Sequence, residues 1–143
     1  MKPIKQLLQT KGNAVWTITP DASVFDAIKL MSDKSVGALP VVDGEKLVGI
    51  ISERDYARKV ILQGRSSRDT PVREIMTTKV YYLRAEQSIE DGMALMTDKR
   101  IRHLPVFESE RMVGIVSIGD LVREIISQQE FLIGQLENYI TGG

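Results

Sequence analysis

The chain carries a serine and an aspartate at one fixed spacing twice, and these residue types suit the binding of phosphate and sugar. Residues 49–55 and residues 114–120 both read Gly-x-x-Ser-x-x-Asp. Where a strand ends and a helix begins at such a serine, the hydroxyl and the exposed backbone N–H groups of the first turn favour an anion such as phosphate. An aspartate one turn later offers two acceptor oxygens that suit a vicinal diol, as on ribose. The glycine permits a close approach or a tight backbone.

A purely structural interpretation of the same residues is also available. Ser52 and Ser117 would then be helix N-caps, and Asp55 and Asp120 would interact favourably with the helix dipole. For either motif alone, the structural interpretation is the stronger one. Two copies in register, within matching strand contexts, favour ligand binding instead.

The two motifs belong to a longer internal repeat whose copies lie 65 residues apart. The same offset relates further pairs of identical residues, namely Ser23 and Ser88, Asp26 and Asp91, Met31 and Met96, and Pro40 and Pro105. A repeated supersecondary unit tends to bury its apolar face against a copy of itself. We therefore expect one repeat in residues 1–70, with an N-terminal lead-in and a linker, and a second in residues 71–143, with a C-terminal helix.

Each repeat reads as strand, helix, strand, strand and helix, which predicts an α/β fold. In the first repeat we expect a strand at 15–18, a helix at 23–33, a hairpin of strands at 38–42 and 46–51, and a helix from 52. In the second repeat we expect a strand at 80–83, a helix at 88–98, a hairpin of strands at 103–107 and 111–116, and a helix from about 120. The tail at 121–140 predicts a long, partly amphipathic helix. That helix could pack on its own domain or form a subunit interface.

Composition excludes several classes of function. Lys plus Arg and Asp plus Glu each number 19 in 143 residues, so no net field attracts nucleic acid or an anionic membrane. Cysteine is absent, which excludes disulfides and thiolate metal sites. Residues 1–8 are too polar for the core of a signal peptide, and no apolar run approaches the ~20 residues of a membrane span. We expect a cytoplasmic protein without a nucleic-acid or membrane partner.

The motifs together resemble a tandem pair of cystathionine-β-synthase-type (CBS) domains, known as a Bateman module. The resemblance covers about residues 12–127 and rests on residues 19–24, 37–43, 49–55, 101–106 and 114–120. The segments at 75–77 and 52–59 resemble small stand-alone bacterial members in particular. This resemblance implies two β-α-β-β-α repeats related by a pseudo-twofold axis. It also implies two clefts that bind adenosine compounds: AMP, ADP, ATP, NAD or S-adenosylmethionine.

The resemblance further implies which residues would hold the ligands. Each cleft would take the serine and aspartate of one repeat with residues of the other repeat, from its first strand and from just before its Leu-Pro-Val segment. The first predicted ligand set is Ser52, Arg54, Asp55, Thr78, Val80, Ile101, Arg102 and His103. The second predicted ligand set is Ser117, Gly119, Asp120, Asn13, Val15, Val36, Gly37 and Ala38.

The two sets differ in charge. The first contains Arg54 and Arg102, and the planar fork of arginine binds phosphate through paired, charge-assisted hydrogen bonds. The second offers Gly119 and Gly37 at the corresponding places, so we expect weaker phosphate selectivity there.

Three further features have open interpretations. His103 is the only histidine and has no partner ligands for a metal, but its titration near neutrality would make phosphate binding depend on pH. Trp16 and Tyr81 occupy equivalent positions, which suits core packing or, alternatively, a wall of an adenine pocket. The basic residues within 54–68 lack interleaved aromatics, so we expect a solvated face and not a nucleic-acid site.

The sequence contains no nucleophile–base pair, carboxylate dyad or P-loop, so we expect no enzyme. The expected function is a non-catalytic module that senses energy or redox state by binding an adenosine nucleotide, with AMP as the favoured ligand. Its signal would pass through a homodimer or to an unknown partner protein. One alternative is a structural interaction adaptor with constitutively bound nucleotide, and another is a nucleotide hydrolase.

Overall fold

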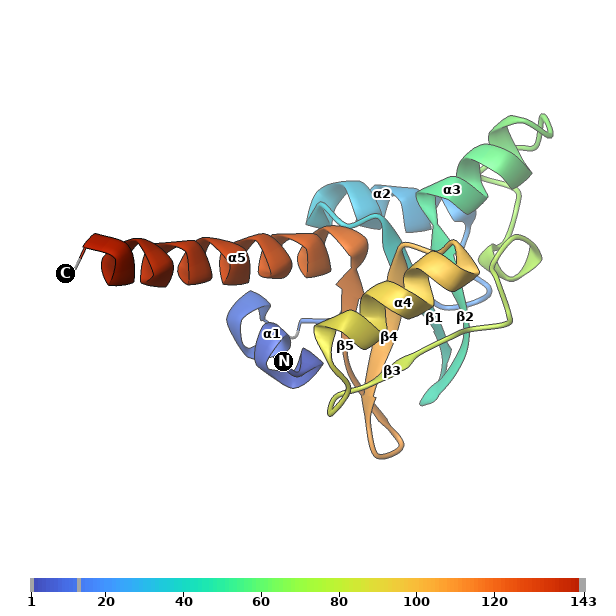
Figure 1. Cartoon of the computed structure of the whole chain (residues 1–143). Coiled ribbons are helices and arrows are strands. Elements are labelled where there is room, and N and C mark those ends of the chain that lie inside the picture. The colour runs from blue at the N-terminus through green and yellow to red at the C-terminus, as the bar shows by residue number, and fades with distance from the viewer. Residues whose placement is uncertain (1, 13, 142–143) are drawn as a thin grey trace. The chain divides into compact units, whose positions relative to one another are not determined.

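The computed structural model describes residues 2–12 and 14–141, and the chain divides into two compact units (Figure 1). Val15–Tyr81 form one unit, which we call the first-repeat unit. Met1–Ala14 and Tyr82–Gly143 form the other, which we call the second-repeat unit. The expected α/β class, with two similar repeats and a C-terminal helix, is confirmed. The ranges 1–70 and 71–143 stay our prediction for the extent of the two repeats.

The first-repeat unit is a two-stranded hairpin packed against helices. Its elements are helix α2 (Val24–Lys34), strands β1 (Ala38–Asp43) and β2 (Lys46–Ser52), helix α3 (Glu53–Tyr56), the π-helical turn η1 (Ala57–Ile61) and the 3-10 turn η2 (Val72–Glu74). β1 and β2 are antiparallel, and Gly44 in their turn takes a left-handed φ of 64°. The buried core consists of Val24, Ala27, Met31, Leu39, Val41, Ile51, Val60, Val72 and Ile75.

The second-repeat unit follows the same plan with one more paired strand. Its elements are helix α1 (Ile4–Lys11), strand β3 (Leu83–Arg84), helix α4 (Ile89–Lys99), strands β4 (His103–Glu108) and β5 (Arg111–Ser117), and helix α5 (Ile118–Thr141). β3 runs parallel to β4, and β4 runs antiparallel to β5. Figure 1 shows that the C-terminal half of α5 extends beyond the other elements of this unit.

The first strand of each repeat differs from our prediction. In place of a strand at 15–18, only Ile18 pairs with β1, in an isolated parallel bridge. In place of a strand at 80–83, pairing begins at Leu83 and continues to Ala85, whose N–H donates to Phe107 O of β4 at 2.9 Å. Pro20 stands at the position equivalent to Ala85 and has no N–H, so pairing in the first repeat ends sooner.

Trp16 lies at the surface, so its interpretation as a core residue is wrong. Its side chain is 41% exposed, and Nζ of Lys34 lies 4.1 Å from the ring centroid. Because the backbone before Ile18 forms no sheet pairing, nothing holds the indole over the core, and the cation–π contact stabilises it outside. Tyr81, at the equivalent position, is half-buried.

The long helix of each repeat begins at the expected serine. Ser23 Oγ accepts from Asp26 N–H, and Ser88 Oγ accepts from Asp91 N–H, each at 3.1 Å. The carboxylate of Asp91 also accepts from Ser88 N–H, which completes a capping box. The predicted N-cap at Ser23 is therefore confirmed.

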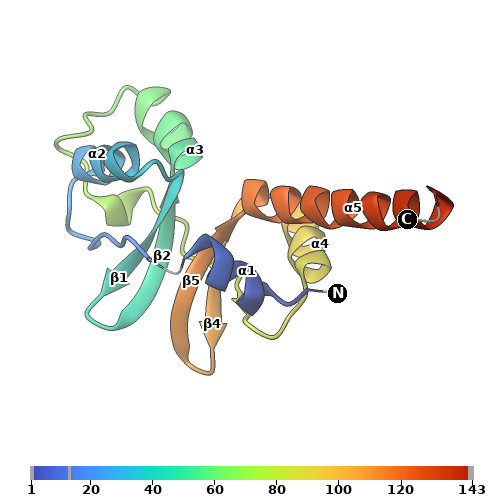
Figure 2. The same cartoon turned by 90° about the vertical axis from the view of Figure 1, so that its left-hand side faces the viewer.

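The segment that precedes the first repeat in the sequence packs in the second-repeat unit. Residues 2–11, which we call the first lead-in, contain α1, and α1 lies beside β5 (Figure 2). Lys2 O accepts from Ile89 N–H at 3.1 Å, and Ile4 N–H donates to Gln87 O at 2.8 Å. The side chain of Ile4 is fully buried, so this unit needs the first lead-in to complete its core.

The segment that precedes the second repeat packs, in the same way, in the first-repeat unit. We call residues 70–77 the second lead-in. Thr70 O accepts from Val24 N–H at 2.8 Å, and Val72 N–H donates to Ala22 O at 2.8 Å. Each lead-in therefore belongs structurally to the repeat that it does not precede.

The two motif glycines give the lead-ins room to pack. A Cβ at Gly114 would lie 2.7 Å from a methyl carbon of Leu8. A Cβ at Gly49 would lie 2.7 Å from Sδ of Met76 and 3.0 Å from the backbone oxygen of Thr77. The close approach that these glycines allow is thus made by the lead-ins.

We expect Gly49→Ala to lower the free energy of unfolding by about 1–3 kcal/mol, because the new methyl group meets the backbone of Thr77 as well as Met76. Gly114→Ala should cost less, since only the flexible end of Leu8 has to move. Urea unfolding of both variants measures the difference.

Gly134→Ala provides the control. This glycine lies within α5 with open space around it, so alanine should raise stability by up to about 1 kcal/mol through helix propensity. An equal or larger loss for Gly114→Ala than for Gly49→Ala would contradict our account of the two packing sites.

Candidate functional site

The first Ser-x-x-Asp motif lies at the corner where β2 ends and α3 begins. Ser52 Oγ accepts from Asp55 N–H at 3.1 Å, while Asp55 Oδ2 accepts from the Ser52 N–H at 3.0 Å and contacts its hydroxyl at 3.1 Å. These contacts form a capping box. The structural interpretation of Ser52 as an N-cap is therefore confirmed. The other carboxylate oxygen, Oδ1, takes no part in the box.

The residues before the first Leu-Pro-Val segment lie against this corner. Ala38 is the register partner of Ser52, and Gly37 O accepts from Glu53 N–H at 3.0 Å. The structure thus brings Gly37 and Ala38, from the second predicted ligand set, next to Ser52 from the first set.

The second Ser-x-x-Asp motif has the same backbone geometry where β5 passes into α5. Ser117 Oγ accepts from Asp120 N–H at 3.1 Å, and Asp120 Oδ2 accepts from Ser117 N–H at 2.8 Å. His103 is the register partner of Ser117, and Arg102 O accepts from Ile118 N–H at 2.8 Å. Both motifs therefore cap their helices in the way expected of the structural interpretation.

The two aspartates differ in the groups that contact them beyond the capping box. Asp55 Oδ1 has two long contacts among the described residues, 3.4 Å to Thr77 Oγ1 and 3.4 Å to Lys59 Nζ. Asp120 Oδ2 lies 2.6 Å from Lys11 Nζ, and its Oδ1 lies 2.8 Å from a guanidinium nitrogen of Arg123. The side chain of Asp120 is 8% exposed, so these ion pairs sit close to the protein interior.

Lys11 takes the structural place of Thr77. In the first-repeat unit, Thr77 N–H donates to Ile50 O at 2.8 Å and the Thr77 hydroxyl faces Asp55. In the second-repeat unit, the Lys11 ammonium donates to Ile115 O at 2.7 Å, the carbonyl equivalent to that of Ile50. A neutral threonine and a charged lysine therefore serve equivalent acceptors.

Sequence reasoning missed Lys11, Thr77 and Arg123. Arg123 follows Asp120 by three residues on one helix, a spacing at which oppositely charged side chains meet, so the signal was present. Lys11 lies 109 residues from Asp120, and no local pattern relates the two. Thr77 lies in the second lead-in, outside the motifs whose residues recur 65 positions apart.

The weaker phosphate selectivity expected of the second ligand set stays a prediction, but within the second-repeat unit the second motif has cations that the sequence analysis did not count. Lys11 and Arg123 contact Asp120 directly, and Arg102 lies close enough to influence His103 electrostatically. A Cβ at Gly119 would lie 3.4 Å from the Arg123 guanidinium, so Arg123 supplies a cation where the glycine has no side chain.

Burial and charge shift two pKa values at this motif. Burial lowers the pKa of His103 below 6.5; Asp120 opposes the shift, while Lys11 and Arg102 add to it. For Asp120, burial acts to raise the pKa, but the hydrogen bonds from Lys11 and Ser117 outweigh it and hold the pKa below 3.8. The titration of His103, which we expected near neutrality, is thus displaced to lower pH.

The two predicted ligand sets draw residues from both units and stay predictions. From the first set, Ser52, Arg54, Asp55, Thr78 and Val80 belong to the first-repeat unit, and Ile101, Arg102 and His103 belong to the second-repeat unit. From the second set, Ser117, Gly119 and Asp120 belong to the second-repeat unit, and Val15, Val36, Gly37 and Ala38 belong to the first-repeat unit. Asn13 lies outside the described residues.

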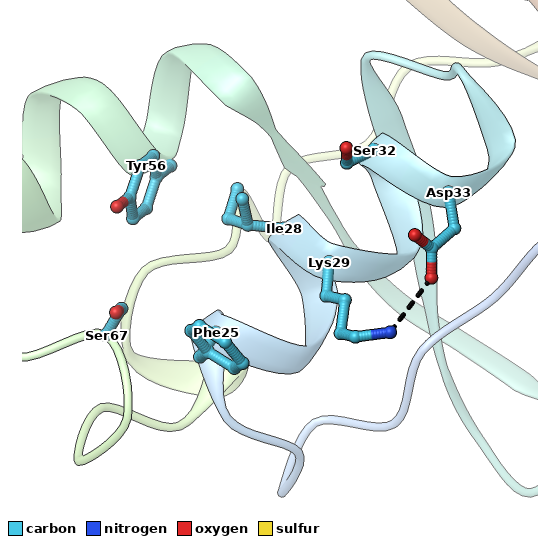
Figure 3. Close-up of a pocket in the computed structure, with 7 residues that line it drawn as sticks. All are labelled: Phe25, Ile28, Lys29, Ser32, Asp33, Tyr56 and Ser67. Carbon is cyan, nitrogen blue, oxygen red and sulfur yellow. Dashed lines mark hydrogen bonds and ion pairs between the residues drawn. The ribbon is translucent and has the colours of Figure 1, made fainter.

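A pocket of about 360 Å³ lies elsewhere in the first-repeat unit, between α2, α3 and the loop at Ser67 (Figure 3). It is lined by Phe25, Ile28, Lys29, Ser32, Asp33, Tyr56 and Ser67, none of which belongs to a predicted ligand set. Within the described residues, no group of three His, Cys, Asp or Glu side chains is placed to hold a metal ion. Across residues 2–12 and 14–141, no helix is long and apolar enough to cross a membrane.

Comparison with known proteins gives the family. The CBS-domain family model matches residues 5–61 and again residues 72–127. The mitochondrial CBS domain-containing protein CBSX3 of Arabidopsis thaliana is 43% identical over 150 residues, which covers 98% of this chain and 72% of that protein. The CBS domain-containing protein YhcV of Bacillus subtilis is 36% identical over 129 residues, which covers 90% of this chain and 89% of that protein.

A solved structure agrees. A candidate signal-transduction protein with CBS domains from Burkholderia ambifaria superposes with a TM-score of 0.86 at 50% identity, covering 90% of this chain and 96% of that one. The chain therefore belongs to the CBS-domain family and carries two CBS domains in tandem, as the sequence motifs predicted. It resembles small stand-alone members of that family.

The pKa of His103 predicts how stability depends on pH. Because the folded pKa lies below the unfolded value of 6.5, the unfolded chain takes up the proton first. The stability that the neutral imidazole contributes is fully present above pH 6.5 and is lost as pH falls through the folded pKa. We expect the free energy of unfolding to fall between about pH 7.5 and pH 5, and His103→Gln to reduce that fall.

Urea unfolding at both pH values measures the effect. Asp120 provides no competing signal in this window, since its pKa lies below 3.8. Identical losses of stability in the natural chain and in His103→Gln would show that the imidazole does not titrate as its burial requires.

Proposed function

We propose that this tandem CBS protein is a non-catalytic regulatory module that binds an adenosine nucleotide at its two Ser-x-x-Asp motifs. The observation that carries the proposal is the pair of motifs within two CBS domains, each at the N-terminus of a helix. Tandem CBS domains are generally regulatory modules, and adenosine compounds are their common ligands. AMP is the ligand that we favour, with ADP, ATP and NAD as the others to test.

Each motif offers chemistry for two parts of such a ligand. The first-turn N–H groups and the serine hydroxyl suit a phosphate, and the aspartate suits the ribose diol. In the first motif, the contacts of Asp55 Oδ1 with Thr77 and Lys59 are 3.4 Å long, so a diol hydroxyl can compete with them. We assign the remaining contacts to the two predicted ligand sets.

Binding would act on the protein by linkage. A ligand can shift an equilibrium between two conformations only by its difference in affinity for them. Since we propose no catalytic step, the change would pass through a homodimer or to a partner protein in the cytoplasm.

A structural adaptor with constitutively bound nucleotide is the second candidate. Both serines and aspartates are already satisfied as helix caps, which an adaptor would also need. Nucleotide that co-purifies and resists dialysis would favour the adaptor. Nucleotide that exchanges freely would favour the sensor.

Calorimetric titration of nucleotide-stripped protein with AMP, ADP, ATP and NAD tests the sensor. We expect saturable binding of at least one ligand. Asp55→Ala and Asp120→Ala should each weaken one site by about tenfold or more, because a hydrogen bond to a charged group contributes about 1.5–3 kcal/mol. No binding by any of the four ligands would overturn the proposal.

The exposed side of α5 suits a second copy of the chain. Val122, Ile126, Ile133 and Leu136 are 39–55% exposed and recur at spacings that place them on one side of a helix. Exposed apolar residues gathered on one side of a helix are typical of an interface between proteins. We therefore assign this stripe to the proposed homodimer.

Substitution of Ile133→Arg, near the centre of this stripe, should weaken the dimer by placing a charge in its apolar interface. Light scattering should give a mass near 16.0 kDa for this variant and twice that for the natural chain. Ser127→Arg, on the opposite side of α5, is the matched control and should stay dimeric. A natural chain that is monomeric at high concentration would contradict the assignment.

A further inference from the structure

We propose that Lys11 makes the second Ser-x-x-Asp motif selective for ligands that carry a phosphate, while the first motif also accepts the nucleoside alone. The inference rests on the proposed function and concerns the selectivity of the second motif. Lys11 is outside both predicted ligand sets and belongs to α1, a helix of the first lead-in.

Every oxygen of Asp120 already has a strong donor. Oδ2 accepts from Ser117 N–H at 2.8 Å and from Lys11 Nζ at 2.6 Å, and Oδ1 accepts from Arg123 at 2.8 Å. A ribose diol that donates to this carboxylate therefore competes with Lys11 at Oδ2 and with Arg123 at Oδ1. Since Asp120 is buried, that exchange takes place where charge is poorly screened.

A neutral nucleoside cannot compensate for the exchange. Its hydroxyls replace a charge-assisted hydrogen bond by a weaker one and leave the Lys11 ammonium without its anion. A phosphate brings a new anion to the same place, so that Lys11 and Arg123 can pair with it as they leave Asp120. The second motif therefore favours a nucleotide over its nucleoside.

The corresponding barrier in the first motif is weaker. Thr77 occupies the place of Lys11, and both its hydroxyl and Nζ of Lys59 lie 3.4 Å from Asp55 Oδ1. Arg58, which is equivalent to Arg123, forms no ion pair with Asp55 among the described residues. A ribose diol therefore has to displace only long contacts there, with or without a phosphate.

The Lys11 side chain can move without loss of the helix that carries it. It is 34% exposed and is the last residue of α1, whereas Ile4, Leu7 and Leu8 anchor that helix in the core. A change of side-chain rotamer is therefore enough to release Asp120.

Calorimetric titration of the full chain with AMP and with adenosine tests the inference. For the natural chain we expect two sites for AMP but one for adenosine, with the adenosine site lost in Asp55→Ala. In Lys11→Gln, adenosine should gain a second site, at least about tenfold tighter than any binding to that motif in the natural chain. Lys11→Arg keeps the cation and should keep the selectivity.

Lys79→Gln is the control for loss of a lysine charge outside the two motifs, because Nζ of Lys79 lies over the ring of Tyr81. It should leave both stoichiometries unchanged. Two adenosine sites in the natural chain, or one in a Lys11→Gln variant that still binds AMP at two sites, would overturn the inference and leave the proposed function intact. Failure of every form to bind AMP would overturn the proposed function and the inference with it.

Discussion

The corner at which a hairpin turns into a helix is the feature on which the rest of each repeat depends. There the serine that ends the second strand of the hairpin donates its N–H to the aspartate. The carbonyl of the residue just before the first strand of the hairpin accepts the first N–H of the helix. These bonds satisfy groups that a helix start leaves unpaired, and such caps contribute about 1 kcal/mol each. The residues that we propose as ligand contacts are therefore also the residues that form the corner.

The two corners share a backbone and differ in charge. Equivalent carbonyls, of Ile50 and Ile115, receive a backbone N–H from Thr77 in one unit and an ammonium group from Lys11 in the other. Because a hydrogen-bond donor is needed at this place but no particular charge, the repeats could diverge here without a change of fold. As a result, Lys11 and Arg123 form ion pairs with Asp120 at 2.6 and 2.8 Å, whereas the contact of Thr77 with Asp55 Oδ1 is 3.4 Å long.

Features encoded locally could be predicted from the sequence. The caps of the long helices, both hairpins and the two Ser-x-x-Asp corners follow from residue type and spacing within a few positions. The strand at 15–18 was predicted too long, because its β-prone residues form no pairing before Ile18, and β-propensity does not itself supply a pairing partner. The contact between Lys11 and Asp120 joins residues 109 positions apart, so only the folded chain reveals it.

The crossed placement of the lead-ins has a consequence for how such a protein can be divided. A cut between residues 70 and 71 would separate the buried residues Val72 and Ile75 from the core of the first-repeat unit. It would also separate the first lead-in from the second-repeat unit, in whose core it packs. Val15–Tyr81 form a continuous stretch of chain, whereas the other unit is assembled from two pieces. The segment that can be moved into another protein unchanged is therefore residues 15–81, which includes the second lead-in. The second-repeat unit can be moved as one chain only by joining residue 14 to residue 82, or by placing residues 1–14 after residue 143.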